Sequence, residues 1–347
     1  MIIGCKVFVN SLRKEVRNME MSRSEIREKH KKKKRWGRKL LKWLFFLLFL
    51  AILGLAGYLG YLYWKASGIV SGAYEEDWRE HSFLRNGPVD PSEDHFSLLI
   101  IGVDESEKRS DLEAFRSDTL LLATFNHDYR SVKLLSIPRD SYVYIPAVGY
   151  ETKINHAYAF GGVDATIETV EKLLNVPVDY YVKVNFEAFI EVVDALGGIT
   201  VDVPYEFTEQ DSNDRADAIH LKAGVQRLNG EEALALARTR KMDNDIERGK
   251  RQQEILKAIV QEAVHPSSIK KYPDVLEAVG ANMKTNMKFD EMRGFLHYMI
   301  TGGPEIETLT LEGHDDWSTG TYYYKLDEIS LDFVRTKLRQ HLELGVM

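Results

Sequence analysis

The sequence predicts an α/β fold, a three-layer α-β-α arrangement around a central mixed sheet, preceded by one transmembrane helix. Two observations predict this architecture. Short apolar runs alternate with segments of helical periodicity through most of the 347 residues, and such alternation favours a sheet covered by helices. Closer to the N-terminus, one apolar run is far longer than any strand in the chain.

That long apolar run is Trp43–Trp64, whose 22 residues include no charged residue and no proline. At a rise of about 1.5 Å per residue, roughly 20 such residues cross the hydrocarbon core of a bilayer. Tryptophan stands at both ends, and aromatic side chains favour membrane interfaces. A cleaved signal peptide has a shorter apolar region of about 7–15 residues. We therefore expect a retained signal anchor.

Charge is divided unequally on the two sides of this segment. The net charge of −7 consists of +11 in residues 1–42 and −18 in the remainder. Positive charge stays on the cytoplasmic side, so we expect a cytoplasmic tail and a cell-membrane protein whose large C-terminal part is extracellular. We interpret the basic tail as a signal that sets membrane orientation and attracts anionic lipid headgroups, rather than as a nucleic-acid-binding segment. The predicted organisation is a tail (1–42), a membrane span (43–64), a linker and lead-in (65–94) and an extracellular catalytic domain (95–347).

The strands and helices of the outer part follow from apolar pattern. Residues 96–103, 119–125 and 132–137 are predicted strands, with a hairpin link at 126–130. Two glycines, Gly197 and Gly198, stop a predicted helix over 186–196. Further strands are expected at 180–184 and 199–203, and further helices at 163–174, 230–237, 245–264, 290–300 and 326–344.

Charged side chains gather at the ends of the first three predicted strands. Asp104 follows the first strand, Arg116 and Asp118 open the second, and Arg139 and Asp140 follow the third. If the strands are neighbours, these residues meet at one rim of the sheet. Mutual ion pairing is one explanation. A metal and phosphate site is the other, since Mg²⁺ prefers carboxylate oxygens and arginine binds phosphate in a bidentate manner.

A second cationic cluster occupies residues 237–253, within the acidic part of the chain. Arg238 and Arg240 are two residues apart, so an extended segment would point both the same way. Arg248, Arg251 and Gln252 share one helix face through their i, i+3, i+4 spacing. A solvated charged face is the ordinary explanation, but concentrated positive charge is relieved by a bound anion such as pyrophosphate.

Seven segments, in order, resemble the LytR-CpsA-Psr family of bacterial cell-wall phosphotransferases. They are IGVD (101–104), RSDTLLL (116–122), SIPRDSYV (136–143), KINHAYAFGG (153–162), VDALGGITVDVP (193–204), HLKAGVQRLNGEEALALARTRK (220–241) and ERGKRQQEIL (247–256). A Gly often precedes the family arginine that Arg248 matches, and here the residue is Glu247.

The resemblance implies transfer of a glycopolymer, with teichoic acid the leading candidate, from an undecaprenyl-pyrophosphate carrier to a peptidoglycan hydroxyl. It also implies Mg²⁺ (or Mn²⁺) on Asp104 and Asp118. The implied pyrophosphate ligands are Arg116, Arg139, Arg238, Arg240, Arg248, Arg251 and Gln252. Arg139 and Asp140 are the candidate catalytic pair, with Asp140 or Asp118 as general base. The helices over 163–174 and 186–196 are candidate walls of a lipid tunnel, or ordinary core helices.

Two other functions are compatible with parts of the sequence. A hydrolase of the same lipid-linked pyrophosphate would use every residue named above, with water in place of the sugar hydroxyl. A non-enzymatic membrane regulator of transcription would act through the basic tail, but the tail has no helix-turn-helix pattern. The transferase is the preferred hypothesis.

Overall fold

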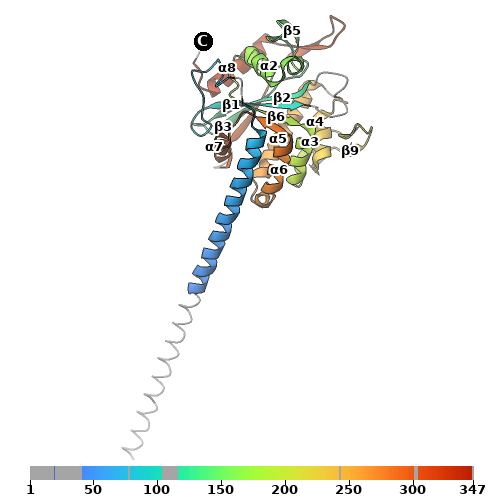
Figure 1. Cartoon of the computed structure of the whole chain (residues 1–347). Helices are drawn as coiled ribbons and strands as arrows, with labels where there is room; N and C mark the ends of the chain where they lie inside the picture. Colours follow the sequence, from blue (N-terminus) through green and yellow to red (C-terminus); the bar gives the residue numbers. More distant parts are fainter. Residues whose placement is uncertain are drawn as a thin grey trace, which may run out of the picture. The chain divides into compact units, whose positions relative to one another are not determined.

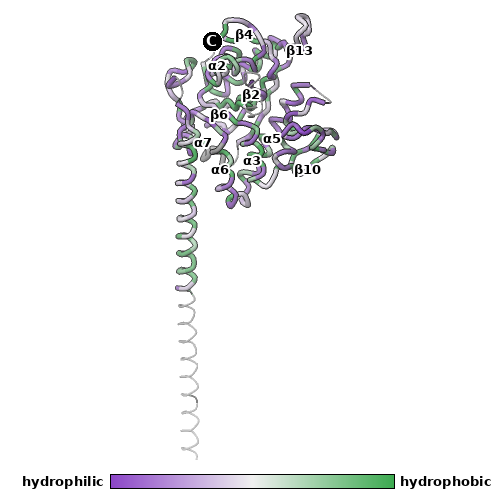
Figure 2. The backbone as a smooth tube through the Cα atoms, turned by 45° about the vertical axis from the view of Figure 1, so that its right-hand side comes forward, coloured by the Kyte–Doolittle hydropathy of each residue, from purple (hydrophilic) through white to green (hydrophobic). Residues whose placement is uncertain are grey.

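The computed structural model describes residues 19, 41–76, 79–103, 116–241, 244–300 and 304–345. The chain divides into two compact units, Met1–Tyr63 and Trp64–Met347. Within the described residues, the helix Leu41–Ala73 is long and apolar enough to cross a membrane (Figure 2). This helix contains the predicted span and continues for nine residues beyond it. The second unit begins well before residue 95, where the sequence places the domain boundary.

The second unit is built on a mixed sheet of six strands in the order β11-β6-β1-β2-β3-β12 (Figure 1). The β1–β2, β2–β3 and β6–β11 pairs are antiparallel, and the β1–β6 and β3–β12 pairs are parallel. The predicted mixed sheet and its hairpin are thus confirmed. The strands are β1 (Phe96–Val103), β2 (Ser117–Asn126), β3 (Ser131–Ser136), β6 (Tyr180–Asn185), β11 (Met283–Thr285) and β12 (Glu305–Thr310).

Helices cover both faces of this sheet, as the strand alternation requires. On one face, Leu99 and Leu122 pack in a core with residues of α2 (His156–Leu174) and α8 (Glu328–His341). On the other, Leu98 and Phe125 pack with residues of α5 (Asp245–Val264) and α7 (Phe289–Ile300). The predicted three-layer arrangement is therefore confirmed.

The remaining elements flank these layers. Asn229 caps α4 through a capping box with Glu232. The predicted helix over 326–344 begins later than expected, because Asp327 caps it at Ser330 after a short strand. The flanking elements are α3 (Phe186–Ala195), α4 (Gly230–Arg238), η2 (Pro266–Lys271), α6 (Tyr272–Asn282), and the strand pairs β4–β5 (Tyr142–Ile145, Tyr150–Lys153), β7–β10 (Ile199–Val203, Gly224–Leu228), β8–β9 (Phe207–Glu209, Ile219–Leu221) and β13–β14 (Gly313–Asp316, Tyr323–Leu326).

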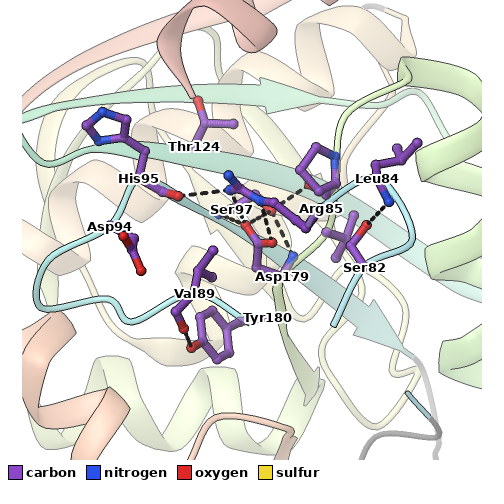
Figure 3. Close-up of polar contacts among 12 residues, drawn as sticks. Ser82, Leu84, Arg85, Val89, Asp94, His95, Ser97, Thr124, Asp179 and Tyr180 are labelled. Carbon is purple, nitrogen blue, oxygen red and sulfur yellow. Dashed lines mark hydrogen bonds and ion pairs between the residues drawn. The ribbon is translucent and has the colours of Figure 1, made fainter. Parts of the chain in front are cut away.

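The lead-in segment is attached to the folded unit by buried polar contacts (Figure 3). Arg85 donates to both carboxylate oxygens of Asp179, at 3.0 and 2.8 Å, and to the carbonyl of His95 at 2.8 Å. Tyr180 donates its hydroxyl to the carbonyl of Val89 at 2.7 Å. A two-pronged arginine pair fixes direction as well as distance. Residues 85–95 therefore pack as part of the domain rather than as a free linker.

His341, at the end of α8, predicts a pH dependence of stability. Its two ring nitrogens lie 2.8 Å from Thr124 Oγ1 and 2.8 Å from Ser131 Oγ. Burial, aided by the charge of Lys133, lowers the pKa of His341 from 6.5 to about 4. The unfolded chain therefore binds the extra proton between these values, and the folded state loses stability as pH falls through them.

We expect this loss to reach at most about 3 kcal/mol between pH 6.5 and pH 4. Above pH 6.5 the imidazole is neutral in both the folded and the unfolded state, so it does not change the free energy of unfolding. Denaturant unfolding at several pH values measures the loss, and His341→Gln should flatten that part of the profile. Parallel profiles for the parent and His341→Gln would contradict the assignment.

Candidate active site: a cationic mouth on an apolar cavity

A β-bulge at the rim of the sheet sets the position of Asp118. Gly102 pairs with Thr119 and Val103 pairs with Ser117, so Asp118 is the extra residue of β2. Bulges change the direction of a side chain at a strand end. The strands approach closely here, because a Cβ on Gly102 would lie 2.9 Å from Thr119 Cβ. As a result, Asp118 lines a cavity beside the sheet.

Arg139 meets Asp118 from the neighbouring strand, as the predicted hairpin topology requires. Its guanidinium donates to the Asp118 carboxylate, and its backbone N–H donates to Asp245 Oδ2 at 3.1 Å. Burial works to lower the pKa of Arg139, but the carboxylates of Asp118, Asp140 and Asp245 hold it above its ordinary value. Arg139 is therefore a fixed positive charge at the cavity wall.

Two further arginines surround Asp245: Arg240 lies in the segment between α4 and α5, and Arg248 lies on α5. Arg248 lies 3.2 Å from Asp245 and donates to the carbonyl of Asp118 at 3.0 Å, and Arg240 lies 3.6 Å from Asp245. Burial, together with the charges of Arg139 and Arg240, lowers the pKa of Arg248 to about 10. Sequence analysis did not single out Asp245, although it lies between the arginines in RKMDNDIER.

Unused hydrogen-bond donors in this cluster point to an anionic ligand. Among the described residues, the buried Nε atoms of Arg139 and Arg248 have no hydrogen-bond partner. A buried donor without a partner costs about 1–3 kcal/mol. A phosphate oxygen would supply the partner and reduce the mutual repulsion of the arginines. The cluster is thus better suited to an anion than to ion pairing alone.

Asp140 does not line the cavity and is held by three cations. Lys153 Nζ lies 2.7 Å from its carboxylate, Arg139 Nε 3.6 Å and Arg240 Nη1 3.8 Å. Burial acts to raise the pKa of Asp140, but these cations lower it below its ordinary value. A carboxylate stabilised as an anion is a weak base. The Asp140 carboxylate is therefore placed to hold the guanidinium groups of Arg139 and Arg240 in position.

The cavity has a volume of about 460 Å³ and changes from charged to apolar along its length. On α5 the residues that line it are Arg248 and Gln252, then Ile255, Leu256 and Ile259. From Arg248 to Ile259 the helix rises roughly 16 Å. The charged mouth and the apolar wall therefore lie on one helix face. The other apolar lining residues include Ala188, Phe189, Val192, Leu234, Val279 and Met283.

Only one of the two predicted tunnel helices lines this cavity. Ala188, Phe189 and Val192 of α3 face it at helical spacing. The prediction for 163–174 is wrong as to the cavity, because Ile167, Val170 and Leu174 of α2 are packed in the core on the opposite face of the sheet. Apolar periodicity identified a buried face in both helices, but not the surface against which each face packs.

The other predicted ligands are distributed between the cavity and its surroundings. Arg238 lines the cavity with its guanidinium 4.9 Å from the centroid of the Phe186 ring. Gln252 also lines it and donates to Thr119 Oγ1 at 3.0 Å. Arg251 instead donates to the backbone carbonyls of Leu236 and Thr239, and so holds the end of α4.

Arg116 and Asp104 are the remaining predicted residues. Arg116 is exposed and does not line the cavity. Its charge acts with burial, the larger cause, to lower the pKa of His156. Asp104 lies outside the described residues. The two predicted metal ligands therefore cannot be compared as a pair, and Asp118 alone is placed at the cavity.

The donor set at Asp118 fits a hard divalent cation. Its carboxylate lines the cavity and is 30% exposed, beside arginines that suit phosphate. Mg²⁺ is commonly bound by one or two carboxylates together with phosphate oxygens of the substrate. Asp118 is thus compatible with the predicted metal role as well as with its ion pair to Arg139.

Comparison with known proteins decides the family. The model of the LytR_cpsA_psr family matches residues 65–340. The chain belongs to the LytR-CpsA-Psr family. An uncharacterized Staphylococcus aureus protein is 44% identical over 268 residues, which are 76% of this chain and 66% of that protein, a little under two thirds. The Bacillus subtilis polyisoprenyl-teichoic acid–peptidoglycan teichoic acid transferase TagT is 42% identical over 269 residues, 77% of this chain and 82% of TagT.

A solved LytR-CpsA-Psr structure agrees with the fold. TagT with a bound octaprenyl pyrophosphate lipid has a TM-score of 0.63 and 36% identity, and the match covers 78% of this chain and 99% of that one. The sequence resemblance to the LytR-CpsA-Psr family is therefore confirmed.

Proposed function

We propose that this LytR-CpsA-Psr protein transfers an anionic glycopolymer, wall teichoic acid, from an undecaprenyl-pyrophosphate carrier to a hydroxyl of peptidoglycan. The observation that carries the proposal is the cavity itself. Its arginines and unused Nε donors suit a pyrophosphate, and its apolar walls suit the attached polyprenyl chain. Support also comes from the teichoic acid transferase name of TagT and from the octaprenyl pyrophosphate in the TagT structure.

In this mechanism the acceptor hydroxyl attacks the phosphorus that carries the polymer. A new phosphorus–oxygen bond forms to the acceptor, and the bond to the carrier phosphate breaks, so that undecaprenyl phosphate leaves. Arg139, Arg240 and Arg248 neutralise the charge that develops on the phosphates, which is the main task in phosphoryl transfer. Mg²⁺ or Mn²⁺ on Asp118, with Asp104, would add positive charge at the same oxygens.

The proton of the acceptor hydroxyl needs a carboxylate at the cavity. Of the two candidates, Asp118 lines the cavity, whereas Asp140 is held by Lys153 and two arginines. We assign the base to Asp118 on the condition that its metal role is only partial, and the positioning of the arginines to Asp140. The proposed location is the cell membrane, with the basic tail cytoplasmic and the catalytic unit outside, where both substrates would be found.

One experiment separates transfer from the hydrolase alternative. The full chain in detergent is incubated with lipid-linked teichoic acid, with and without polymer-free peptidoglycan. We expect polymer covalently attached to peptidoglycan, resistant to extraction in hot detergent, and little release when peptidoglycan is omitted. Equal release of phosphorylated polymer in both reactions, without attachment, would assign a hydrolase instead.

A further inference from the structure

Four aromatic side chains form a surface cluster on the hairpins β4–β5 and β13–β14, here termed the aromatic platform: Tyr142, Trp317, Tyr322 and Tyr323. The ring centroids of Trp317 and Tyr322 are 5.0 Å apart, and those of Tyr142 and Tyr323 are 4.8 Å apart. Trp317 is 65% exposed. An exposed tryptophan beside further aromatic rings is typical of binding surfaces.

The turn that carries Trp317 is held by several polar contacts. Asp316 accepts from the N–H of Ser318 at 2.9 Å and pairs with Lys325 at 2.8 Å. Tyr322 donates its hydroxyl to Asp315 at 2.9 Å. These contacts hold the turn in place, so a ligand would cost little ordering of the turn on binding.

The platform is joined directly to the arginine cluster. The N–H of Tyr324 donates to the carbonyl of Asp140 at 2.9 Å. Lys153, whose ammonium lies 2.7 Å from the Asp140 carboxylate, also lies 5.6 Å from the centroid of the Tyr322 ring and 5.9 Å from that of Tyr323. The ammonium group of Lys153 therefore lies between the platform and Asp140, the residue that positions Arg139 and Arg240.

A second hollow, of about 340 Å³, borders the platform at Tyr142. Its lining includes Tyr144, Lys172 and Lys325 together with the carboxylates of Glu151 and Glu328, and Lys325 lies 5.9 Å from the centroid of the Tyr142 ring. Aromatic faces pack against the C–H faces of sugar rings, and ammonium groups bind carboxylates. The surface thus offers aromatic faces to a sugar strand, and Lys172 offers an ammonium group to an acidic substituent, whereas Lys325 is paired with Asp316.

We infer that the aromatic platform binds the acceptor, a peptidoglycan glycan strand, and directs a sugar hydroxyl toward the arginine cluster. The inference rests on the proposed function, since it assigns the acceptor side of that reaction. A lipid surface is a poorer occupant, because the charged side chains of Asp316 and Lys325 lie beside the exposed tryptophan.

Binding of the full chain in detergent to two separate probes tests the inference. The first probe is a teichoic-acid-free peptidoglycan glycan strand of defined length, and the second is octaprenyl pyrophosphate. Trp317→Ala should weaken glycan binding about three- to tenfold and leave binding of octaprenyl pyrophosphate unchanged. Trp317→Tyr should retain most of the affinity. Tyr129→Ala removes a still more exposed aromatic ring from the turn between β2 and β3, and should change neither affinity.

Each outcome has a definite meaning. Equal glycan affinity of the parent, Trp317→Ala and Tyr129→Ala would overturn the inference, even if octaprenyl pyrophosphate binds. Failure of the parent to bind octaprenyl pyrophosphate would instead contradict the proposed function. In nanodiscs, brominated lipid should quench the interfacial Trp43 and Trp64 equally in the parent and in Trp317→Phe. A smaller quenched fraction in Trp317→Phe than in the parent would place the platform at the membrane and overturn the glycan assignment.

Discussion

Replacement of Arg238 by Ala is expected to weaken binding of octaprenyl pyrophosphate roughly ten- to a hundredfold while the melting temperature stays close to that of the parent. A hydrogen bond to a charged group contributes about 1.5–3 kcal/mol, and about 1.4 kcal/mol is tenfold in affinity. Arg238 lines the cavity and stacks on Phe186. It takes no part in the ion pairs among the described residues of the arginine cluster, so its removal leaves that cluster intact.

The matched control is Arg251, a second predicted pyrophosphate ligand that has a different role in the structure. Its guanidinium donates to the carbonyls of Leu236 and Thr239, so Arg251→Ala should lower the free energy of unfolding by about 1.5–3 kcal/mol. Calorimetric titration and thermal melts distinguish the two variants. Arg238→Lys should restore only part of the affinity, because an ammonium lacks the two-pronged geometry. Unchanged affinity in Arg238→Ala would place the phosphate site elsewhere.

Replacement of Val192 by Trp should block the apolar part of the cavity. Val192 lines it from α3, opposite the apolar lining residues of α5. Each buried CH₂ contributes about 0.8 kcal/mol, so displacement of roughly four carbons would cost about 3 kcal/mol, or about a hundredfold in affinity. Affinity for octaprenyl pyrophosphate should therefore fall sharply, whereas affinity for a short-chain prenyl pyrophosphate should change little.

The neighbouring residue provides the control for this substitution. Glu191 is exposed on α3, so Glu191→Trp adds the same side chain on the solvent side of the helix. It should leave both affinities at the parent value. If Val192→Trp weakened short and long chains alike, the cavity would hold only the headgroup and the lipid would lie elsewhere. Thermal melts of both variants verify that each one is folded.

Sequence pattern alone was sufficient for several features of this protein. Uninterrupted apolarity identified the helix around Trp43–Trp64, because a bilayer requires about 20 such residues. Short apolar runs and turn spacing identified β1, β2 and β3 and the hairpin of β2 with β3, and hence the approach of Asp118 to Arg139. Family motifs then named the arginines of the mouth. These features depend on local pattern and chain order, which a sequence contains directly.

The tertiary structure decided what each buried or charged face contacts. Arg248 and Arg251 are three residues apart on one helix, yet Arg248 lines the cavity and Arg251 binds the end of α4. The apolar faces of α2 and α3 look alike in sequence, but only that of α3 lines the cavity. The bulge at Asp118 likewise depends on the register between two strands. A periodic pattern specifies which face of an element is buried, whereas its partner is set by contacts between residues distant in sequence.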